Sequence, residues 1–144
     1  MSPVKVMVVD DDVAFVETLS KRLAKRNLGV VRAHSGLEAI GKLGEERDID
    51  IVVLDVKMPG MTGIDTLREI KKIYPLVEVI ILTGHASVSS AIEGMKLGAY
   101  DYLLKPCDMD QLMAKIAEAE AKKARHEEKI LEAQMIEMTL RSRD

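Results

Sequence analysis

The sequence has a single cysteine, no large excess of either charge and no long apolar run. Cys107 stands alone among 144 residues, which excludes an internal disulfide and any metal site that needs several cysteines. Lys and Arg total 21 and Asp and Glu total 24, so the net charge of -3 creates no basic field for nucleic acid or anionic lipid. No apolar run approaches the ~18 residues of a membrane span, and residues 1–5 carry no charged leader. We therefore expect a cytoplasmic protein with no nucleic-acid or membrane partner.

Two glycine-rich phosphate-binding patterns are also absent from the sequence. A dinucleotide-binding fold would carry Gly-x-Gly-x-x-Gly after its first strand, where glycine N–H groups meet the pyrophosphate. This chain instead presents three carboxylates there, Asp10, Asp11 and Asp12, and it contains no P-loop pattern. Neither kind of nucleotide binding is expected.

Short runs rich in Val, Ile and Leu alternate with segments of helical period. The runs are residues 4–9, 28–32, 51–54, 77–82 and 100–104. Such runs are typical of strands that are covered on both faces, and a chain of this length can bury one substantial core. The alternation predicts an α/β fold, a doubly wound sheet of five parallel strands.

The segments between the runs predict helices with apolar faces and recognisable ends. The apolar positions are Val13, Val16, Leu19 and Leu23, then Leu37, Ile40 and Leu43, then Ile64, Leu67 and Ile70, then Val88, Ile92 and Met95. Helix starts are indicated by Ser35 with Glu38, Thr62 with Asp65, and Asp108 with Gln111. Gly98 is placed to end the fourth helix.

Acidic residues close two of the predicted strands. Asp10, Asp11 and Asp12 follow the first run, and Asp55 follows the third. Parallel strands end at the same edge of a sheet, so these carboxylates are expected to meet there, where a cation would relieve their repulsion. The arrangement predicts a metal-dependent phosphoryl site. The simpler alternative is a solvated turn in which Asp12 caps the next helix.

Four separate motifs, in order, carry a family resemblance. They are Val8-Val-Asp10-Asp11, Leu54-Asp55-Val-Lys57-Met-Pro-Gly60, Leu82-Thr-Gly-His-Ala86 and Tyr102-Leu-Leu-Lys105-Pro106. Over about residues 4–122 the chain resembles the receiver domain of bacterial two-component response regulators, of the stand-alone type. The resemblance implies a flavodoxin-like sheet of order 2-1-3-4-5 with five helices. It also implies a receiver domain at 1–124 and a C-terminal extension at 125–144.

The resemblance assigns roles at the acidic edge. Mg²⁺ would be the cofactor, held directly by Asp11 and Asp55, through water by Asp10, and by the backbone carbonyl of Lys57. Asp55 would be the phosphoacceptor, forming an acyl phosphate. The remaining catalytic groups would be Lys105, whose ammonium offsets phosphoryl charge, and Thr83, whose hydroxyl donates to a phosphate oxygen.

The phosphodonor would be a histidine kinase, a phosphotransfer protein or a small phosphorylated molecule. A haloacid-dehalogenase-type phosphatase also uses an aspartate nucleophile, but it has a second aspartate two positions later, where this chain has Lys57. The chain is therefore not expected to be an enzyme, apart from catalysing its own aspartyl phosphorylation and dephosphorylation. A different class stays open: an interaction module that binds Mg²⁺ without being phosphorylated.

The resemblance also implies a switch that serves an unknown downstream protein in a phosphorelay. Thr83 would move toward the phosphoryl group, Tyr102 would rotate into the vacated space, and Pro106 would follow a cis bond. The simpler alternative is that Tyr102 is only a half-buried strand aromatic, and the switch role is the one we expect. His85, two residues past Thr83, is a candidate to influence hydrolysis of the acyl phosphate.

The last third is predicted to be helical because residues 108–141 contain neither Gly nor Pro. Leu112, Ile116 and Ala119 would face the core. A second face follows a 4-3 repeat: Ala117, Ala121, Ala124, Glu128, Leu131, Met135 and Met138. This face could form a homodimer, dock a partner, or belong to a solvated or disordered tail. A homodimer could also use the face formed by the fourth helix, fifth strand and fifth helix.

Overall fold

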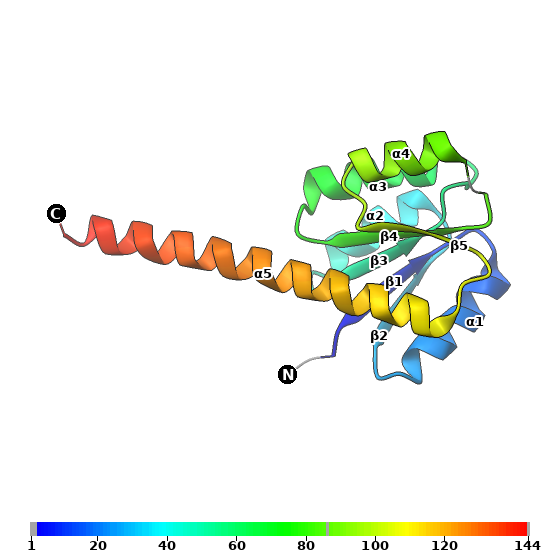
Figure 1. Ribbon diagram of the computed structural model, residues 1–144, viewed down its shortest axis with the longest axis horizontal. Coiled ribbons are helices and arrows are strands. Elements are labelled where there is room, and N and C mark those ends of the chain that lie inside the picture. Colours follow the sequence, from blue (N-terminus) through cyan, green and yellow to red (C-terminus); the bar gives the residue numbers. More distant parts are fainter. Residues whose placement is uncertain (1–2, 86, 144) are drawn as a thin grey trace.

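The computed structural model describes residues 3–85 and 87–143 and has one five-stranded parallel sheet at its centre (Figure 1). The strands are β1 (Lys5–Val9), β2 (Gly29–Ala33), β3 (Ile51–Leu54), β4 (Glu78–Thr83) and β5 (Asp101–Leu104). Their spatial order is β2-β1-β3-β4-β5, as expected. Because β1 and β3 are neighbours in register, with Val9 beside Leu54, the residues that follow them emerge side by side.

Five helices cover the two faces of the sheet. They are α1 (Val13–Ala24), α2 (Gly36–Glu45), α3 (Gly63–Ile73), α4 (Val88–Lys96) and α5 (Met109–Arg141). Alternate residues of the strands enter two separate cores. One core joins the sheet to α1 and α5, and the other joins it to α2 and α3. Figure 1 shows α2, α3 and α4 on one side of the sheet and α1 and α5 on the other.

The helix ends follow the sequence signals. Ser35, Thr62 and Asp108 are N-caps whose side chains accept backbone N–H groups, and Asp12 caps α1 in the same way. Gly98 has φ +102° directly after α4, the left-handed conformation that ends helices. The strands begin or end within one residue of the predicted runs.

The apolar stripe of α4 differs from the prediction. Val88, Ile92 and Met95 mark the helix, but they are 78%, 50% and 46% exposed and do not enter the core. The helix instead approaches the sheet through Gly94, where an added Cβ would lie 2.7 Å from the Cδ1 of Ile81. A glycine contact brings α4 close to the sheet while its larger side chains face solvent. Val13 and Leu37, the first apolar positions of two other predicted helices, are likewise exposed.

Helix α5 packs against the sheet with its first part and extends beyond it with the rest (Figure 1). Leu112, Ile116 and Ala119 are buried, as expected. Farther along, Lys122 pairs with buried Glu78 at 3.3 Å and Lys123 pairs with Asp50 at 3.1 Å. In residues 3–85 and 87–143, none of the helices combines the length and apolar character needed to cross a bilayer.

Candidate functional site

Three carboxylates meet at the edge where β1 and β3 end. Asp10, Asp11 and Asp55 each offer an oxygen, and these oxygens all lie within 4.8 Å of one another. Asp10 and Asp55 are 1% and 5% exposed, whereas Asp11 is open to solvent. Buried carboxylates at this spacing repel each other, and hard oxygen donors suit Mg²⁺. The structure therefore brings together the acidic residues that the sequence placed at two strand ends.

Backbone hydrogen bonds fix the two buried carboxylates, Asp10 and Asp55, in place. The N–H of Asp10 donates to the carbonyl of Ala33 on β2, and the N–H of Asp55 donates to the carbonyl of Val9 on β1. The Asp10 side chain accepts the N–H of Asp12 at 3.0 Å, and the Asp55 side chain accepts the N–H of Val56 at 2.9 Å. Each carboxylate thus keeps one oxygen bound to backbone.

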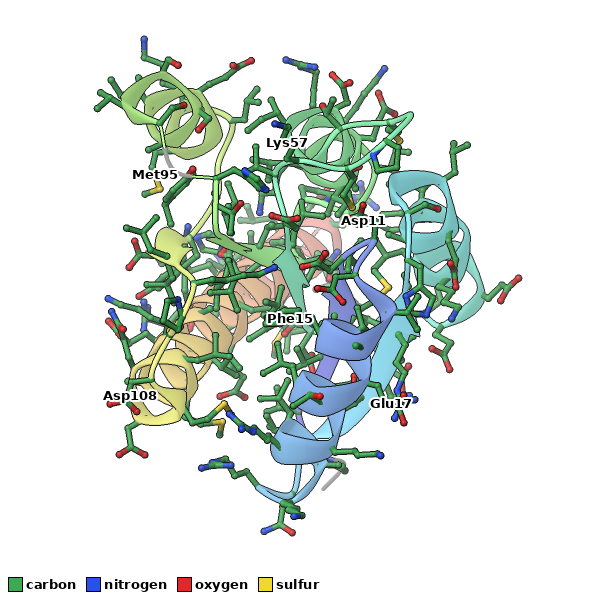
Figure 2. The ribbon with its side chains drawn as sticks, turned by 90° about the vertical axis from the view of Figure 1, so that its right-hand side faces the viewer. Asp11, Phe15, Glu17, Lys57, Met95 and Asp108 are labelled. Atoms are coloured by element: carbon green, nitrogen blue, oxygen red, sulfur yellow. The ribbon has the colours of Figure 1, made fainter. Side chains whose placement is uncertain are left out.

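Lys105 follows β5 and reaches across to the acidic cluster. Its ammonium forms a close ion pair with Asp10, and the Lys105–Pro106 peptide bond is cis. The same ammonium lies 3.9 Å from the centre of the Phe15 ring, on the first turn of α1. Figure 2 looks onto this edge, with Phe15 below Asp11 and Lys57 above it. The structure thus brings the ammonium of Lys105 to the acidic cluster, with Asp10 as its partner.

Thr83 and Tyr102 both contact His85. Thr83 is fully buried at the end of β4, and its hydroxyl accepts the N–H of His85 at 3.1 Å. The half-buried Tyr102 donates its hydroxyl to the carbonyl of His85 at 3.3 Å and lies 3.0 Å from the hydroxyl of Ser90. The two predicted switch residues are thus connected through His85, which lies in the loop between β4 and α4.

These groups surround one open cavity. Its lining contains Asp10, Asp11, Asp12, Asp55, Lys57, Met58, Pro59, Gly84, His85 and Lys105. The carboxylates and the ammonium of Lys105 therefore line the same cavity. Because the cavity is open to solvent, a charged group such as a phosphoryl group could enter it. Of the three histidines, only His85 is among these lining residues.

Burial raises the pKa of the Asp55 carboxyl, and the charge of Asp10 raises it further, against the lowering effects of Thr83 and Lys105. A raised pKa in the fold means that Asp55 opposes folding once it is ionised. This penalty is absent below the ordinary pKa of a carboxyl group and develops as the pH rises through the folded value.

Asp55→Asn should therefore raise the melting temperature at neutral pH in the presence of a chelator. The gain should shrink as the pH falls below the ordinary carboxyl value, because both proteins are then neutral at position 55. Thermal unfolding across pH measures this. Asp12→Asn, which keeps an N-cap acceptor, is the control and should change little. A lower melting temperature for Asp55→Asn at neutral pH would contradict the explanation.

Sequence reasoning missed two residues that position the site. Phe15 supplies the ring beside Lys105, and its N–H is held by the Asp12 cap at 3.1 Å. Gly63 begins α3, and a Cβ added there would lie 2.0 Å from the carbonyl oxygen of Asp55. The sequence did contain a signal for this contact, namely the glycine that follows the Thr62 cap. Glycine is required there because the backbone at residue 63 lies too close to the backbone of Asp55 for any side chain.

Comparisons with known proteins agree with this geometry. The family model described as the response regulator receiver domain matches residues 6–117. The chain is 41% identical over 116 residues to the transcriptional regulatory protein ZraR of Klebsiella oxytoca, covering 81% of this chain and 26% of that protein. It is 36% identical to the DNA-binding transcriptional regulator NtrC of Escherichia coli K12, covering 79% of this chain and 24% of NtrC. The chain spans about a quarter of the length of the curated relatives it matches.

Solved structures show the same likeness. A response regulator receiver domain protein from Clostridium thermocellum has a TM-score of 0.80 and 39% identity, with 84% of this chain and 97% of that chain covered. CheY of Borrelia burgdorferi, solved in a complex with CheX, BeF3 and Mg²⁺, has a TM-score of 0.75 and 28% identity, with 79% and 87% covered.

Proposed function

The chain belongs to the family of response regulator receiver domains, and from that membership we propose that it accepts a phosphoryl group on Asp55 beside a bound Mg²⁺. The observation that carries the proposal is the convergence of the clustered carboxylates Asp10, Asp11 and Asp55 and the ammonium of Lys105 on a single open cavity. A folded module with only a structural role would gain nothing from burying two carboxylates so close together.

The carboxylates fit a Mg²⁺ ion. Asp11 and Asp55 would hold it directly and Asp10 through water, and Lys57, which lines the same cavity, would add its carbonyl oxygen. When bound, the ion would neutralise the cluster and share oxygens with the phosphoryl group. Mg²⁺ is also present in the solved complex of Borrelia burgdorferi CheY.

Asp55 has the role of nucleophile in this proposal. One of its carboxylate oxygens bonds to the phosphorus of the donor, and the bond from phosphorus to the leaving group breaks, with the electron pair going to that group. A phosphohistidine on a histidine kinase or a phosphotransfer protein, or a small acyl phosphate, would serve as donor. Lys105 is already at the cavity and would exchange its contact with Asp10 for one with the phosphoryl oxygens.

Transmission of the signal would begin at His85. If the Thr83 hydroxyl turns to a phosphoryl oxygen, it gives up the N–H of His85, the residue whose carbonyl binds Tyr102. Phosphorylation would in this way alter the neighbouring surface of α4, β5 and α5, where Ile92, Met95 and Leu104 are exposed. A downstream protein, or a second copy of the chain, would bind this surface.

Intact-mass measurement after incubation with Mg²⁺ and acetyl phosphate tests the proposal. The expected result is a gain of one phosphoryl group that disappears when Mg²⁺ is removed by a chelator. If the protein binds Mg²⁺ yet its mass stays unchanged with every phosphodonor, the alternative class of a non-phosphorylated module replaces the proposal.

Removal of one metal ligand gives a separate prediction. Mg²⁺ at a hundredfold excess over its dissociation constant should stabilise the fold by about 2.7 kcal/mol. Asp11→Asn should weaken Mg²⁺ binding by about tenfold or more, since even changes to groups that orient ligands have effects of that size. Thermal shifts in a Mg²⁺ titration provide the measurement. Asp48→Asn removes the same charge beside Lys5 at the other end of β1 and should leave the affinity unchanged.

The Phe15 ring gives a prediction about rate. An ammonium over an aromatic ring gains about 0.5–2 kcal/mol, so Phe15→Leu should slow phosphorylation by about twofold to thirtyfold at saturating Mg²⁺. Phe15→Tyr keeps the ring face and should react at nearly the normal rate. Time-resolved intact mass measures both. Equal rates for Leu and Tyr, with both variants folded, would show that the ring does not position Lys105.

A further inference from the structure

Helix α5 carries a row of exposed side chains that follows the 4-3 repeat, and from residue 124 to residue 143 the chain is exposed on all sides. We call this row the outer stripe: Ala117, Ala121, Ala124, Glu128, Leu131, Met135 and Met138, all of them exposed. Leu131, Met135 and Met138 are 57%, 58% and 67% exposed. At 3.6 residues per turn, the stripe lies roughly 110° around the helix from the buried residues Leu112 and Ile116. The stripe therefore points to one side of the contact between α5 and the sheet, and its three alanines beside the domain are exposed.

The stripe has a gradient of size along the helix. Its three alanines lie near the domain, and its three large side chains lie near the C-terminal end. In a parallel pair of helices each residue would face its own copy, so alanine would meet alanine, methionine would meet methionine, and Glu128 would meet Glu128. An antiparallel pair matches small with large side chains.

We propose that two copies of this chain pair their α5 helices antiparallel along the outer stripe. The register that fits places Ala121 opposite Met138 of the partner, Ala124 opposite Met135, and Glu128 opposite Leu131. In this register the small residues of each helix pack against the large residues of the other. The two Glu128 side chains are not opposite each other, because each lies opposite a Leu131.

The charges beside the stripe favour the same arrangement. In antiparallel pairing, Arg125 lies next to Glu132 of the partner and Glu120 lies next to Arg141. Glu127 then neighbours an uncharged residue, Gln134. A parallel pair would instead place Glu127 beside Glu132, two like charges, and Glu120 beside Arg125, so that its one repulsion offsets its one attraction. The sizes of the stripe residues and the charges of the residues beside them therefore both favour antiparallel pairing.

Helix α5 leaves the domain in a direction that would place the paired helices away from the cavity. Lys122 and Lys123 pair with Glu78 and Asp50 of the sheet, which fixes α5 where it leaves the domain. An antiparallel pair would therefore hold the two domains at opposite ends of a short rod. The cavity lined by Asp55 lies where β1 and β3 end and stays open in the pair. Figure 1 shows α5 extending past the opposite edge of the sheet.

Cysteine cross-linking of the full chain tests the direction of pairing. In a Cys107→Ser background, Ala121→Cys is mixed with Met138→Cys under mild oxidation. Antiparallel pairing predicts a mixed disulfide between the two variants, whereas each variant alone should remain uncoupled because its own cysteines lie about 25 Å apart along the rod. Self-coupling of each variant without the mixed product would show parallel pairing and overturn the proposal.

Sedimentation of the unmodified chain tests whether the pair forms. The mass should rise from the 16.0 kDa monomer toward twice that value as the concentration increases from micromolar to millimolar. The double variant Met135→Lys and Met138→Lys should stay monomeric, and Ala133→Lys, on the opposite side of the helix, should still associate. A chain that stays monomeric throughout, or a double variant that associates normally, would reject the outer stripe as an interface.

Discussion

Asp55→Asn should abolish phosphoryl uptake completely, while the protein remains folded and at least as stable as the wild type at neutral pH. The amide has nearly the shape of the carboxylate, but it is a far weaker nucleophile and cannot form an acyl phosphate. The loss should therefore be total rather than a reduced rate. Intact mass after incubation with Mg²⁺ and acetyl phosphate measures it.

The geometry explains why Asp55 rather than Asp10 should be the acceptor. Asp10 is in a close ion pair with Lys105 and also accepts the N–H of Asp12, so both of its oxygens are engaged. Asp55 accepts the N–H of Val56 with one oxygen and lines the open cavity. Asp12→Asn, which changes a neighbouring carboxylate outside the cluster, is the control and should be phosphorylated normally. Full phosphorylation of Asp55→Asn would place the acceptor elsewhere.

Gly63→Ala should destabilise the fold by about 3 kcal/mol and disturb the position of Asp55. An added Cβ at residue 63 would lie 2.0 Å from the carbonyl oxygen of Asp55 and 2.6 Å from the Cα of Val56, far inside contact distance. These are backbone atoms, so no side-chain rotation can relieve the overlap. The start of α3 or the strand end that carries Asp55 must move.

Chemical denaturation and phosphorylation rate together measure this effect. The matched control is Gly41→Ala in α2, where an added Cβ meets no atom within 4 Å. Alanine at this open helical position should stabilise the protein by about 0.5–1 kcal/mol. If Gly63→Ala were as stable as Gly41→Ala, the close approach of α3 to Asp55 would have no energetic consequence.

Much of the fold was predictable because its signals are local. Apolar runs gave the strands, and short polar residues such as Ser35 and Thr62 gave the helix starts, since each depends on only a few neighbouring residues. The meeting of Asp10 with Asp55 also followed from sequence, because parallel strands end at one edge.

The remaining features depend on contacts between distant segments. Apolar spacing identified α4 but gave no sign that Ile92 and Met95 would face solvent, because that orientation is set by the contact of Gly94 with the sheet. The pairing of Lys105 with Asp10 and with Phe15 joins segments about ninety residues apart. The family resemblance implied that Lys105 acts at the acidic edge, but no periodicity within one segment encodes its contacts with Asp10 and Phe15.

The most direct test of the central claim is to locate the phosphoryl group. Borohydride reduces an aspartyl phosphate to homoserine, so protein treated with Mg²⁺, acetyl phosphate and then borohydride can be digested and sequenced by mass spectrometry. The proposed function predicts homoserine at position 55 and aspartate at positions 10, 11 and 12. Homoserine at another position, or unmodified aspartate at 55 in protein that has gained phosphoryl mass, would contradict it.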